Sequence, residues 1–488
     1  MKHSIAWPRP RWGWHWIVLL PASLTLAWMA RLVAADPRWL VIAAAPLLYL
    51  GLLIASLRRP LVFVAIFLAA LMLLPPLYLR SLGDSPFYVS TLLVPIGLLI
   101  LLSRPLELGS RLNSVGAGLA FLLLGTGLSL PFSFWLSGTT VGAQSLCRWL
   151  MLVQMALVYA IIRAHRDVQG AERVFPWLMG TAVVSAAYGA FDFFWPVPLP
   201  HPAADQFIWL EHAVVRRAQG VFYESCNFGN FCGLFLVIAA AALLSGREHV
   251  LRIRREWLVL FVAILTPAVV LAFSRSVWVS ILISLLAFAA VSPHAKVKRA
   301  ATLVLALGLP LVALWLYVPQ IWDYVVGVRL ADLSQIFSDP NFASSGRWDV
   351  WRRVSELLQD NPQYLLFGIG YKTLPYTRLF RGEIIADNGY LSLLLETGIL
   401  GLGGFLLFSR SVLATFFKLV RRRRDAVAFW AGVLFAFWCG ECIQMLAADA
   451  YTYWRTMVVL TALMAFTLNA SEVDPPASFA PISTEKLG

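Results

Sequence analysis

Charged residues are scarce in this chain: only 13% of its 488 residues are Asp, Glu, Lys or Arg, whereas 60% are hydrophobic. A soluble chain of this length would be roughly half apolar and about 25% charged. The composition therefore excludes an ordinary soluble protein and predicts an integral membrane protein. The 20 Trp and 14 Tyr residues, many of them near the ends of apolar runs, are typical of aromatic belts at the two membrane interfaces.

Cysteine is also rare, with five residues in the whole chain. The sequence Cys439-Gly-Glu-Cys442 has the spacing of a redox motif, but it lies within an apolar run and no βαβ pattern surrounds it. We interpret these cysteines as packing residues and expect neither a disulfide framework nor a metal site. A cleavable signal peptide is not expected either, because the first apolar segment is of full length and lacks a clear cleavage site.

The net charge of +13 is distributed in short basic clusters between apolar segments. The longest cluster, Arg421–Arg424, directly follows an apolar run. Such clusters are typical of topology signals, so we expect no nucleic-acid partner.

A membrane-spanning helix needs about 20 mostly apolar residues. By this criterion the sequence predicts an all-α membrane protein of about 14 spans (12–14). Each inner connection is basic when both termini are placed in the cytoplasm. The predicted spans are 14–34, 38–57, 60–80, 86–103, 115–136, 143–162, 174–195, 226–245, 256–273, 276–292, 300–318, 388–409, 426–446 and 453–469.

This topology divides the chain into membrane bundles and two outward-facing loops. A large, partly helical periplasmic loop lies between the eleventh and twelfth spans. Within it, "RWDVWRRVSELLQDNP" has apolar residues at helical spacing, which predicts an amphipathic helix along the outer membrane face. The predicted regions are an N-terminal bundle (1–195), a first periplasmic loop (196–225), further spans (226–318), the large loop (319–386), C-terminal spans (387–469) and a disordered cytoplasmic tail (470–488).

Several polar residues gather on the outer side of this topology. Arginine suits phosphate because its planar fork makes bidentate, charge-assisted hydrogen bonds. A neighbouring carboxylate suits removal of a proton from a hydroxyl. Together they describe a site for a diphosphate leaving group and an alcohol nucleophile, although roles in topology and packing stay open. The residues are Arg216, Arg217, Arg275, Arg347, Asp387 and Asn388.

The order of four segments resembles the O-antigen ligase and polymerase superfamily of bacterial multi-span glycosyltransferases. The resemblance covers roughly residues 216–468 and implies transfer of a glycan from undecaprenyl diphosphate to an acceptor hydroxyl at the periplasmic side of the inner membrane. It further implies inversion without a metal ion, and no cofactor. The four segments are "RRAQGVFYESCNFGNF", "FSRS", "SGRWDVWRRVSELLQDNPQYLLFGIG" and "DNGYLSLLLETGILGL".

The resemblance also implies residue roles. Arg217 and Arg275 match the diphosphate-binding arginines, and Arg216 is the alternative to Arg217. Asp387 occupies the place of the family's histidine base, which favours a polymerase over a ligase. Asp387 alternatively orients the acceptor while Glu224 or another group takes the proton.

The remaining candidates have weaker signals. Arg275 is alternatively an interface anchor, and Asp387-Asn388 alternatively the N-cap of the following span. Arg347, Trp348 and Trp351 are candidates for contact with the carrier or the sugar, with loop packing as the alternative. We expect Glu396 to have a structural role, because it lies more than two turns into its span.

The sequence thus favours a surface polysaccharide polymerase, with an O-antigen ligase as the alternative. Protein O-glycosylation and membrane transport are further alternatives, and transport is disfavoured because the polar residues gather at one face rather than at mid-membrane. The expected partners are the lipid-linked glycan, an acceptor glycan and the lipid bilayer; a chain-length regulator protein stays open.

Overall fold

The computed structural model describes residues 38–78, 86–103, 113–165, 171–196, 206–209, 214–222, 224–292, 347–377, 379, 386–423 and 425–473. The chain divides into two units, Met1–Phe63 and Val64–Gly488. The first unit contains α2 (Arg38–Arg58) and the beginning of α3 (Pro60–Leu73). The predicted spans 14–34 and 300–318 lie outside the described residues.

The regular structure of the described residues is helical, apart from two short antiparallel strand pairs. β1 (Leu77–Tyr78) pairs with β2 (Pro86–Phe87), and β3 (Phe207–Trp209) pairs with β4 (Val214–Arg216) in a register that sets Phe207 opposite Arg216. The helices of the second unit are η2 (Val89–Leu93), α4 (Val94–Leu102), α6 (Ser114–Gly127), α7 (Leu130–Ala164), α8 (Ala171–Phe194), α9 (Ser225–Ser245), η3 (Glu248–Leu251), α10 (Arg255–Leu271), α11 (Arg275–Val291), α16 (Arg347–Asp360), η5 (Pro362–Tyr364), α17 (Gly389–Arg422), α18 (Ala426–Gln444), η6 (Ala450–Thr452) and α19 (Trp454–Val473).

Five of the described helices are long and apolar enough to cross a membrane, and shorter apolar helices accompany them. This confirms the predicted helical membrane architecture without fixing the number of spans. The five are Leu130–Ala164, Arg173–Phe194, Ser225–Ser245, Gly389–Arg422 and Ala426–Gln444.

The boundary between the predicted spans 115–136 and 143–162 is wrong. α6 ends at Gly127, and residues 130–136 belong to α7 instead. α7 is itself interrupted at Gly138, whose φ of 87° leaves the helical range, and this interruption falls between the two predicted spans. Hydropathy places both sides of this break in apolar sequence and gives no sign of which helix the intervening residues join.

Local sequence signals account for several helix ends. Asn113 caps α6 by accepting a hydrogen bond from the Gly116 N–H at 2.9 Å. Asp425 caps α18 in the same way, because its Oδ1 accepts from the Val427 and Ala428 N–H groups. α9 ends at Gly246, which adopts the left-handed conformation that glycine tolerates best.

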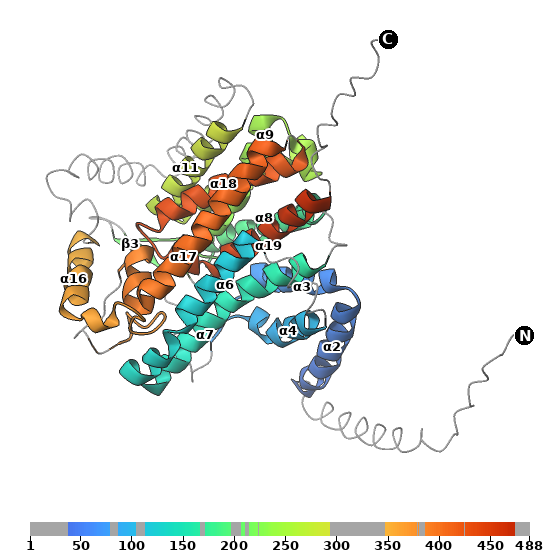
Figure 1. Ribbon diagram of the computed structural model, residues 1–488. Helices are drawn as coiled ribbons and strands as arrows, with labels where there is room; N and C mark the ends of the chain where they lie inside the picture. Colours follow the sequence, from blue (N-terminus) through green and yellow to red (C-terminus); the bar gives the residue numbers. More distant parts are fainter. Residues whose placement is uncertain are drawn as a thin grey trace, which may run out of the picture. The chain divides into compact units, whose positions relative to one another are not determined.

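α6 and α17 lie side by side along much of their length (Figure 1). Glycines allow the two backbones to approach closely. A Cβ atom added to Gly125 would lie 2.3 Å from the Leu400 carbonyl oxygen, and one added to Gly118 would lie 2.7 Å from the Phe408 Cα. Small residues at a close crossing are typical of helix association in membranes, where packing replaces the hydrophobic effect.

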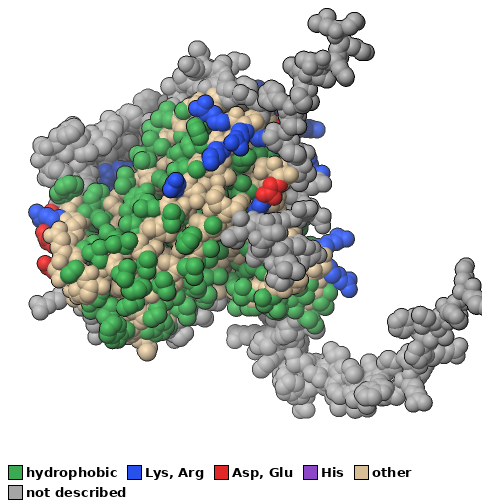
Figure 2. All heavy atoms as spheres, in the orientation of Figure 1, with side chains coloured by type: hydrophobic (Ala, Val, Ile, Leu, Met, Phe, Trp, Pro, Cys, Tyr) green, Lys and Arg blue, Asp and Glu red, His purple; other side chains and the backbone are tan. Residues whose placement is uncertain are grey.

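Hydrophobic side chains cover much of the face shown in Figure 2, while Lys and Arg appear mainly near its top and along its margins. Exposed apolar residues occur on α6, at Phe121 and Leu124, and on α17, at Ile399 and Leu406. A contiguous exposed apolar surface is what a helix bundle presents to lipid.

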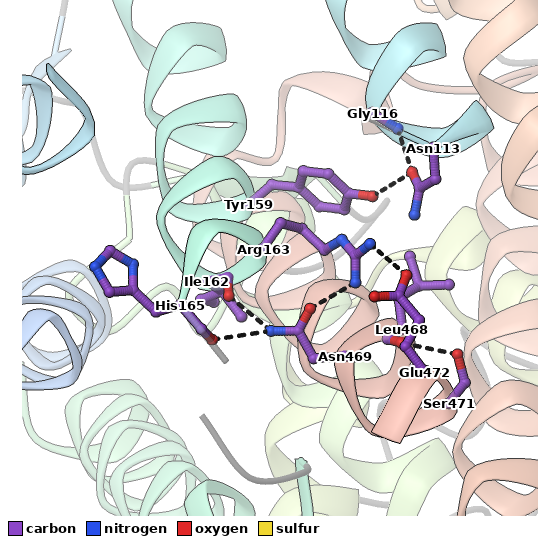
Figure 3. A network of polar contacts seen from close by, with 10 residues as sticks. All are labelled: Asn113, Gly116, Tyr159, Ile162, Arg163, His165, Leu468, Asn469, Ser471 and Glu472. Carbon is purple, nitrogen blue, oxygen red and sulfur yellow. Dashed lines mark hydrogen bonds and ion pairs between the residues drawn. The ribbon is translucent and has the colours of Figure 1, made fainter. Parts of the chain in front are cut away.

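A polar network joins the C-terminal ends of α7 and α19 (Figure 3). The buried Arg163 donates to Asn469 Oδ1 and to Glu472 Oε1, each at 2.5 Å. Asn469 in turn donates to the Ile162 carbonyl at 2.7 Å. These contacts show that α19 is helical through Val473, four residues past the predicted end of the span.

We expect Gly125→Ala to destabilise the protein by about 1–3 kcal/mol, because the new methyl group would overlap the Leu400 carbonyl. The measurement is the free energy of unfolding in detergent micelles. Gly403→Ala on α17 is the matched control, since a Cβ atom there meets nothing within 4 Å. Equal loss of stability in both variants would contradict the close α6–α17 crossing.

Candidate functional site

Segments that are distant in sequence meet at one common end of the helices. The Gly389 N–H, at the start of α17, donates to the Met445 carbonyl just after α18 at 2.7 Å. The Arg217 Nε, shortly before α9, donates to the Ala272 carbonyl just after α10 at 2.9 Å. The starts of α9, α11, α17 and α19 therefore lie at the same end of the bundle as the ends of α10 and α18.

The segment 365–370 fits into an interruption of α17. Gly398 leaves the helical conformation, with φ 67° and ψ −168°. The Ile399 N–H then donates to the Leu365 carbonyl at 2.8 Å, and the Gly370 N–H donates to the Glu396 carbonyl at 2.9 Å. The interrupted helix and the loop thus satisfy each other's backbone groups, as a membrane interior requires.

Glycine is required on both sides of this contact. A Cβ atom at Gly368 would lie 2.3 Å from the Glu396 backbone, and one at Gly398 would lie 2.3 Å from the Leu366 carbonyl oxygen. Both residues also have positive φ angles, which disfavour any other side chain. The Gly-x-Gly sequence is therefore a packing requirement of the loop.

Glu396 lies beside this contact and is 1% exposed. Its Oε1 accepts a hydrogen bond from the Leu374 N–H at 3.1 Å. The carboxylate within the apolar run thus contacts loop backbone rather than the open end of the site. A structural role for Glu396 is still a prediction, and its contact with the Leu374 N–H favours that prediction.

The loop continues into Lys372, which forms an ion pair with Asp449 from the α18–α19 connection. Lys372 has a φ of 55°, a strained conformation for a residue with a side chain. Arg148 of α7 donates to the Lys372 carbonyl at 2.9 Å and lies over the Tyr376 ring. Burial lowers the pKa of Lys372, but the Asp449 and Glu396 carboxylates outweigh this and raise it.

Sequence reasoning missed both members of this pair. Lys372 follows the Gly-x-Gly segment directly, and Asp449 follows the apolar run of α18. Each is a charged residue next to a motif or a span, which is a signal that many loop residues share.

The adjacent arginines of the first loop have different partners. Arg216 forms an ion pair with the buried Asp192 of α8, with 3.0 Å between Nη2 and Oδ2. Arg217 points the other way: besides the Ala272 carbonyl it contacts Cys226 Sγ in the first turn of α9, at 3.2 Å. Arg217 is therefore the arginine at the meeting point of the segments.

Arg275 is the first residue of α11 and is partly buried. It follows a tight turn in which Phe273 has a φ of 48°. Because Arg217 holds the Ala272 carbonyl at the start of the same turn, the backbone segments of Arg217 and Arg275 are adjacent.

Asp387 and Asn388 have different hydrogen-bond partners. Asn388 caps α17, since its Oδ1 accepts from the Tyr390 and Leu391 N–H groups at 3.1 Å each. Asp387, with a φ of 44°, directs its carboxylate to Arg347 instead, with 3.2 Å between Oδ2 and Nε. The capping role expected for the Asp-Asn pair therefore falls to Asn388.

α16 lies beside the beginning of α17 (Figure 1). Its apolar residues Val354 and Leu358 are buried against Leu374 and Leu395. The expectation that this helix rests its apolar side on the membrane surface is corrected, because that side packs against protein.

The two tryptophans of α16 differ in exposure. Trp351 Nε1 donates to the Ala386 carbonyl at 2.9 Å, which holds α16 close to Asp387. Trp348 is 52% exposed, and its ring centroid lies 6.4 Å from that of Trp351. Packing thus accounts for the contact of Trp351, while much of the Trp348 ring is accessible.

Several of these charged groups act on Glu224. It immediately precedes α9 and is partly buried. Burial raises the pKa of its carboxyl; Lys372 and Arg217 lower it, whereas Asp449 and Asp387 raise it further, and the net shift is upward. Groups from the first loop, the large loop and the α18–α19 connection thus act on one carboxylate.

The site therefore combines arginines with several carboxylates at one end of a helix bundle. Among the described residues, no group of three His, Cys, Asp or Glu is arranged to hold a metal ion. The arginines can bind an anionic group, and a carboxylate beside them can accept a proton from a hydroxyl.

Residues 259–406 match the family model described as O-antigen ligase. The match includes Arg275, Arg347, Lys372, Asp387 and Glu396, and it confirms the family resemblance of the sequence motifs for this part of the chain. Arg217, Glu224 and Asp449 lie outside the matched range. A search of curated proteins finds no match to the chain.

We expect Glu396→Ala to loosen the loop, because the buried Leu374 N–H would lose its acceptor at a cost of about 1–3 kcal/mol. Faster hydrogen exchange in residues 365–377 would report this change. Glu396→Gln is the matched control, since its amide oxygen can still accept the hydrogen bond from the Leu374 N–H. Unchanged exchange in the alanine variant would contradict the anchoring contact.

Proposed function

We propose that this protein, whose residues 259–406 carry an O-antigen ligase family domain, transfers a glycan from undecaprenyl diphosphate to an acceptor sugar hydroxyl. The support for a membrane transferase of the O-antigen ligase and polymerase type is the match of residues 259–406 to the family model. The observation that carries the finer proposal is the adjacency of the Arg217 and Arg275 segments beside a group of carboxylates.

The chemistry of the leaving group explains the arginines. When the bond between the sugar and the diphosphate breaks, negative charge grows on the phosphate oxygens. Guanidinium groups stabilise this charge through paired hydrogen bonds, and they are most effective when they are held in place before the reaction. Arg217 meets this condition, because Ala272 and Cys226 fix its guanidinium.

A surface polysaccharide polymerase is the finer assignment that we favour. The support is Asp387, which stands where ligases of the resembling family typically carry histidine. An O-antigen ligase is the second candidate, because the matching family model bears that description. In both cases the positive-inside topology of the sequence favours a site on the periplasmic side of the inner membrane.

We expect Arg217→Ala and Arg275→Ala each to lower the rate of glycan transfer by about 10²- to 10³-fold, because each removes a charge-stabilising donor. The assay uses purified protein, an undecaprenyl-diphosphate-linked glycan and the acceptor glycan. Arg352→Ala is the control, since Arg352 is exposed and pairs with Asp349 of its own helix. Full activity of both variants would contradict the assignment of the diphosphate site.

Deleting the gene distinguishes the two candidate functions. A polymerase deletion leaves single repeat units on the cell surface and removes the long chains. A ligase deletion leaves full-length polymer attached to the lipid carrier. Electrophoresis of surface glycans together with extraction of the lipid-linked fraction measures both outcomes, and an unchanged pattern in both fractions would contradict glycan transfer.

A further inference from the structure

We propose that Glu224 is the proton acceptor of the transfer reaction, and that the Lys372–Asp449 pair positions and balances it. The proposal rests on the glycan-transfer function proposed above and adds the assignment of the base within that reaction.

The first argument concerns the first turn of α9. The first N–H groups of a helix need side-chain acceptors, which short side chains such as Asp and Asn provide most often. At α9 an acceptor is Gln206, whose Oε1 accepts from Ser225 N at 3.0 Å and from Ser225 Oγ at 2.6 Å. The Glu224 side chain makes no capping hydrogen bond. Its carboxylate is therefore left available for chemistry.

The second argument is the contrast with Asp387. The Asp387 Oδ2 lies 3.2 Å from Arg347 Nε, and its side chain is 46% exposed. Arg347 thus occupies one of its oxygens. The Glu224 carboxylate, by contrast, is partly buried and accepts no hydrogen bond from the part of the chain that the structure describes. Asp387 fits better as a residue that orients the acceptor.

The third argument is the pair of cations that act on Glu224. Arg217 contacts Cys226, two residues along the chain from Glu224, at 3.2 Å. The charges of Arg217 and of Lys372 both favour the ionised form of Glu224. Arg217 also belongs to the proposed diphosphate site. An inverting displacement brings the acceptor hydroxyl to the face of the anomeric carbon opposite the diphosphate, so the sugar would lie between the Arg217 guanidinium and the Glu224 carboxylate.

Other titratable groups complete the surroundings of Glu224. Asp449 and Asp387 oppose its ionisation, while Tyr88 and Tyr453 also lie within range of its charge. A phenol is neutral at physiological pH, so neither tyrosine adds charge. Arg217 and Lys372 are therefore the two cations that lower the pKa of Glu224 against burial and the two carboxylates.

The proposed reaction is a displacement at the anomeric carbon of the donor sugar. The acceptor hydroxyl oxygen forms a bond to the anomeric carbon, and the bond from that carbon to the diphosphate oxygen breaks. The electron pair of the broken bond leaves with the lipid diphosphate. The hydroxyl proton passes to a Glu224 carboxylate oxygen and is released to solvent after the product departs.

The acidic limb of the pH–rate profile tests the assignment. A base must be deprotonated, so the rate falls as the pH drops through its pKa; for Glu224 that pKa lies above the ordinary glutamate value. Removing Lys372 withdraws a charge that lowers this pKa. We expect Lys372→Met to shift the acidic limb to higher pH and Lys372→Arg to leave it in place.

Substitution of Glu224 itself is the second test. We expect Glu224→Gln to reduce kcat by about 10²- to 10⁴-fold with little change in the KM for the lipid-linked donor. Glu224→Asp should restore part of the rate. Asp387→Asn should slow the reaction but keep the acidic limb. Thermal unfolding of each variant in detergent separates loss of chemistry from loss of fold.

The outcomes distinguish this proposal from the proposed function. Wild-type turnover of Glu224→Gln beside an inactive Arg217→Ala would overturn Glu224 as the base and leave glycan transfer intact. Loss of the acidic limb in Asp387→Asn would overturn it in favour of Asp387. An unshifted limb in Lys372→Met would overturn the role of the pair, even if Glu224→Gln failed to fold. Absence of transfer by the wild-type protein would instead reject the proposed function.

Discussion

The structure of the site depends on the exchange of backbone hydrogen bonds between interrupted α17 and the segment 365–370. An unsatisfied backbone group in a membrane interior costs several kcal/mol, so a helix can break there only where other groups replace the lost partners. The Leu365 carbonyl and the Gly370 N–H provide these partners. The large loop is consequently fixed to α17 around Gly398, and Lys372 follows two residues after that attachment.

Electrostatics then organises the open end of the bundle. Cations and carboxylates alternate there: Arg347 with Asp387, Lys372 with Asp449, and Arg217 beside Glu224. Partly buried charges need partners, because desolvation penalises an isolated ion. A doubly charged diphosphate would enter an environment already neutralised by pairs, so an arginine whose described hydrogen bonds go to neutral groups is best placed to receive it. Arg217, which contacts a carbonyl and a thiol, fits that description better than Arg216.

The sequence could predict the helical membrane architecture, because hydropathy over about 20 residues is a local property. It could also predict Arg217, Arg275 and Asp387 as candidates, since each stands in a recognisable motif. It could not predict the Lys372–Asp449 pair, whose members are separated by 77 positions and meet only through the tertiary fold. The motif favoured Arg217 over Arg216, but the Arg216–Asp192 ion pair that physically separates them appears only in the tertiary structure.

Two helix starts show how an amide side chain can provide the cap beside a carboxylate. At α17, Asn388 accepts from the first N–H groups, and Asp387 turns to Arg347. At α9, Gln206 accepts from Ser225, the first residue of the helix, and the Glu224 side chain makes no capping hydrogen bond. The two carboxylates differ in their surroundings. Asp387 is paired with Arg347, whereas Glu224 is subject to the charges of Arg217 and Lys372. This difference favours Glu224 over Asp387 as the proton acceptor.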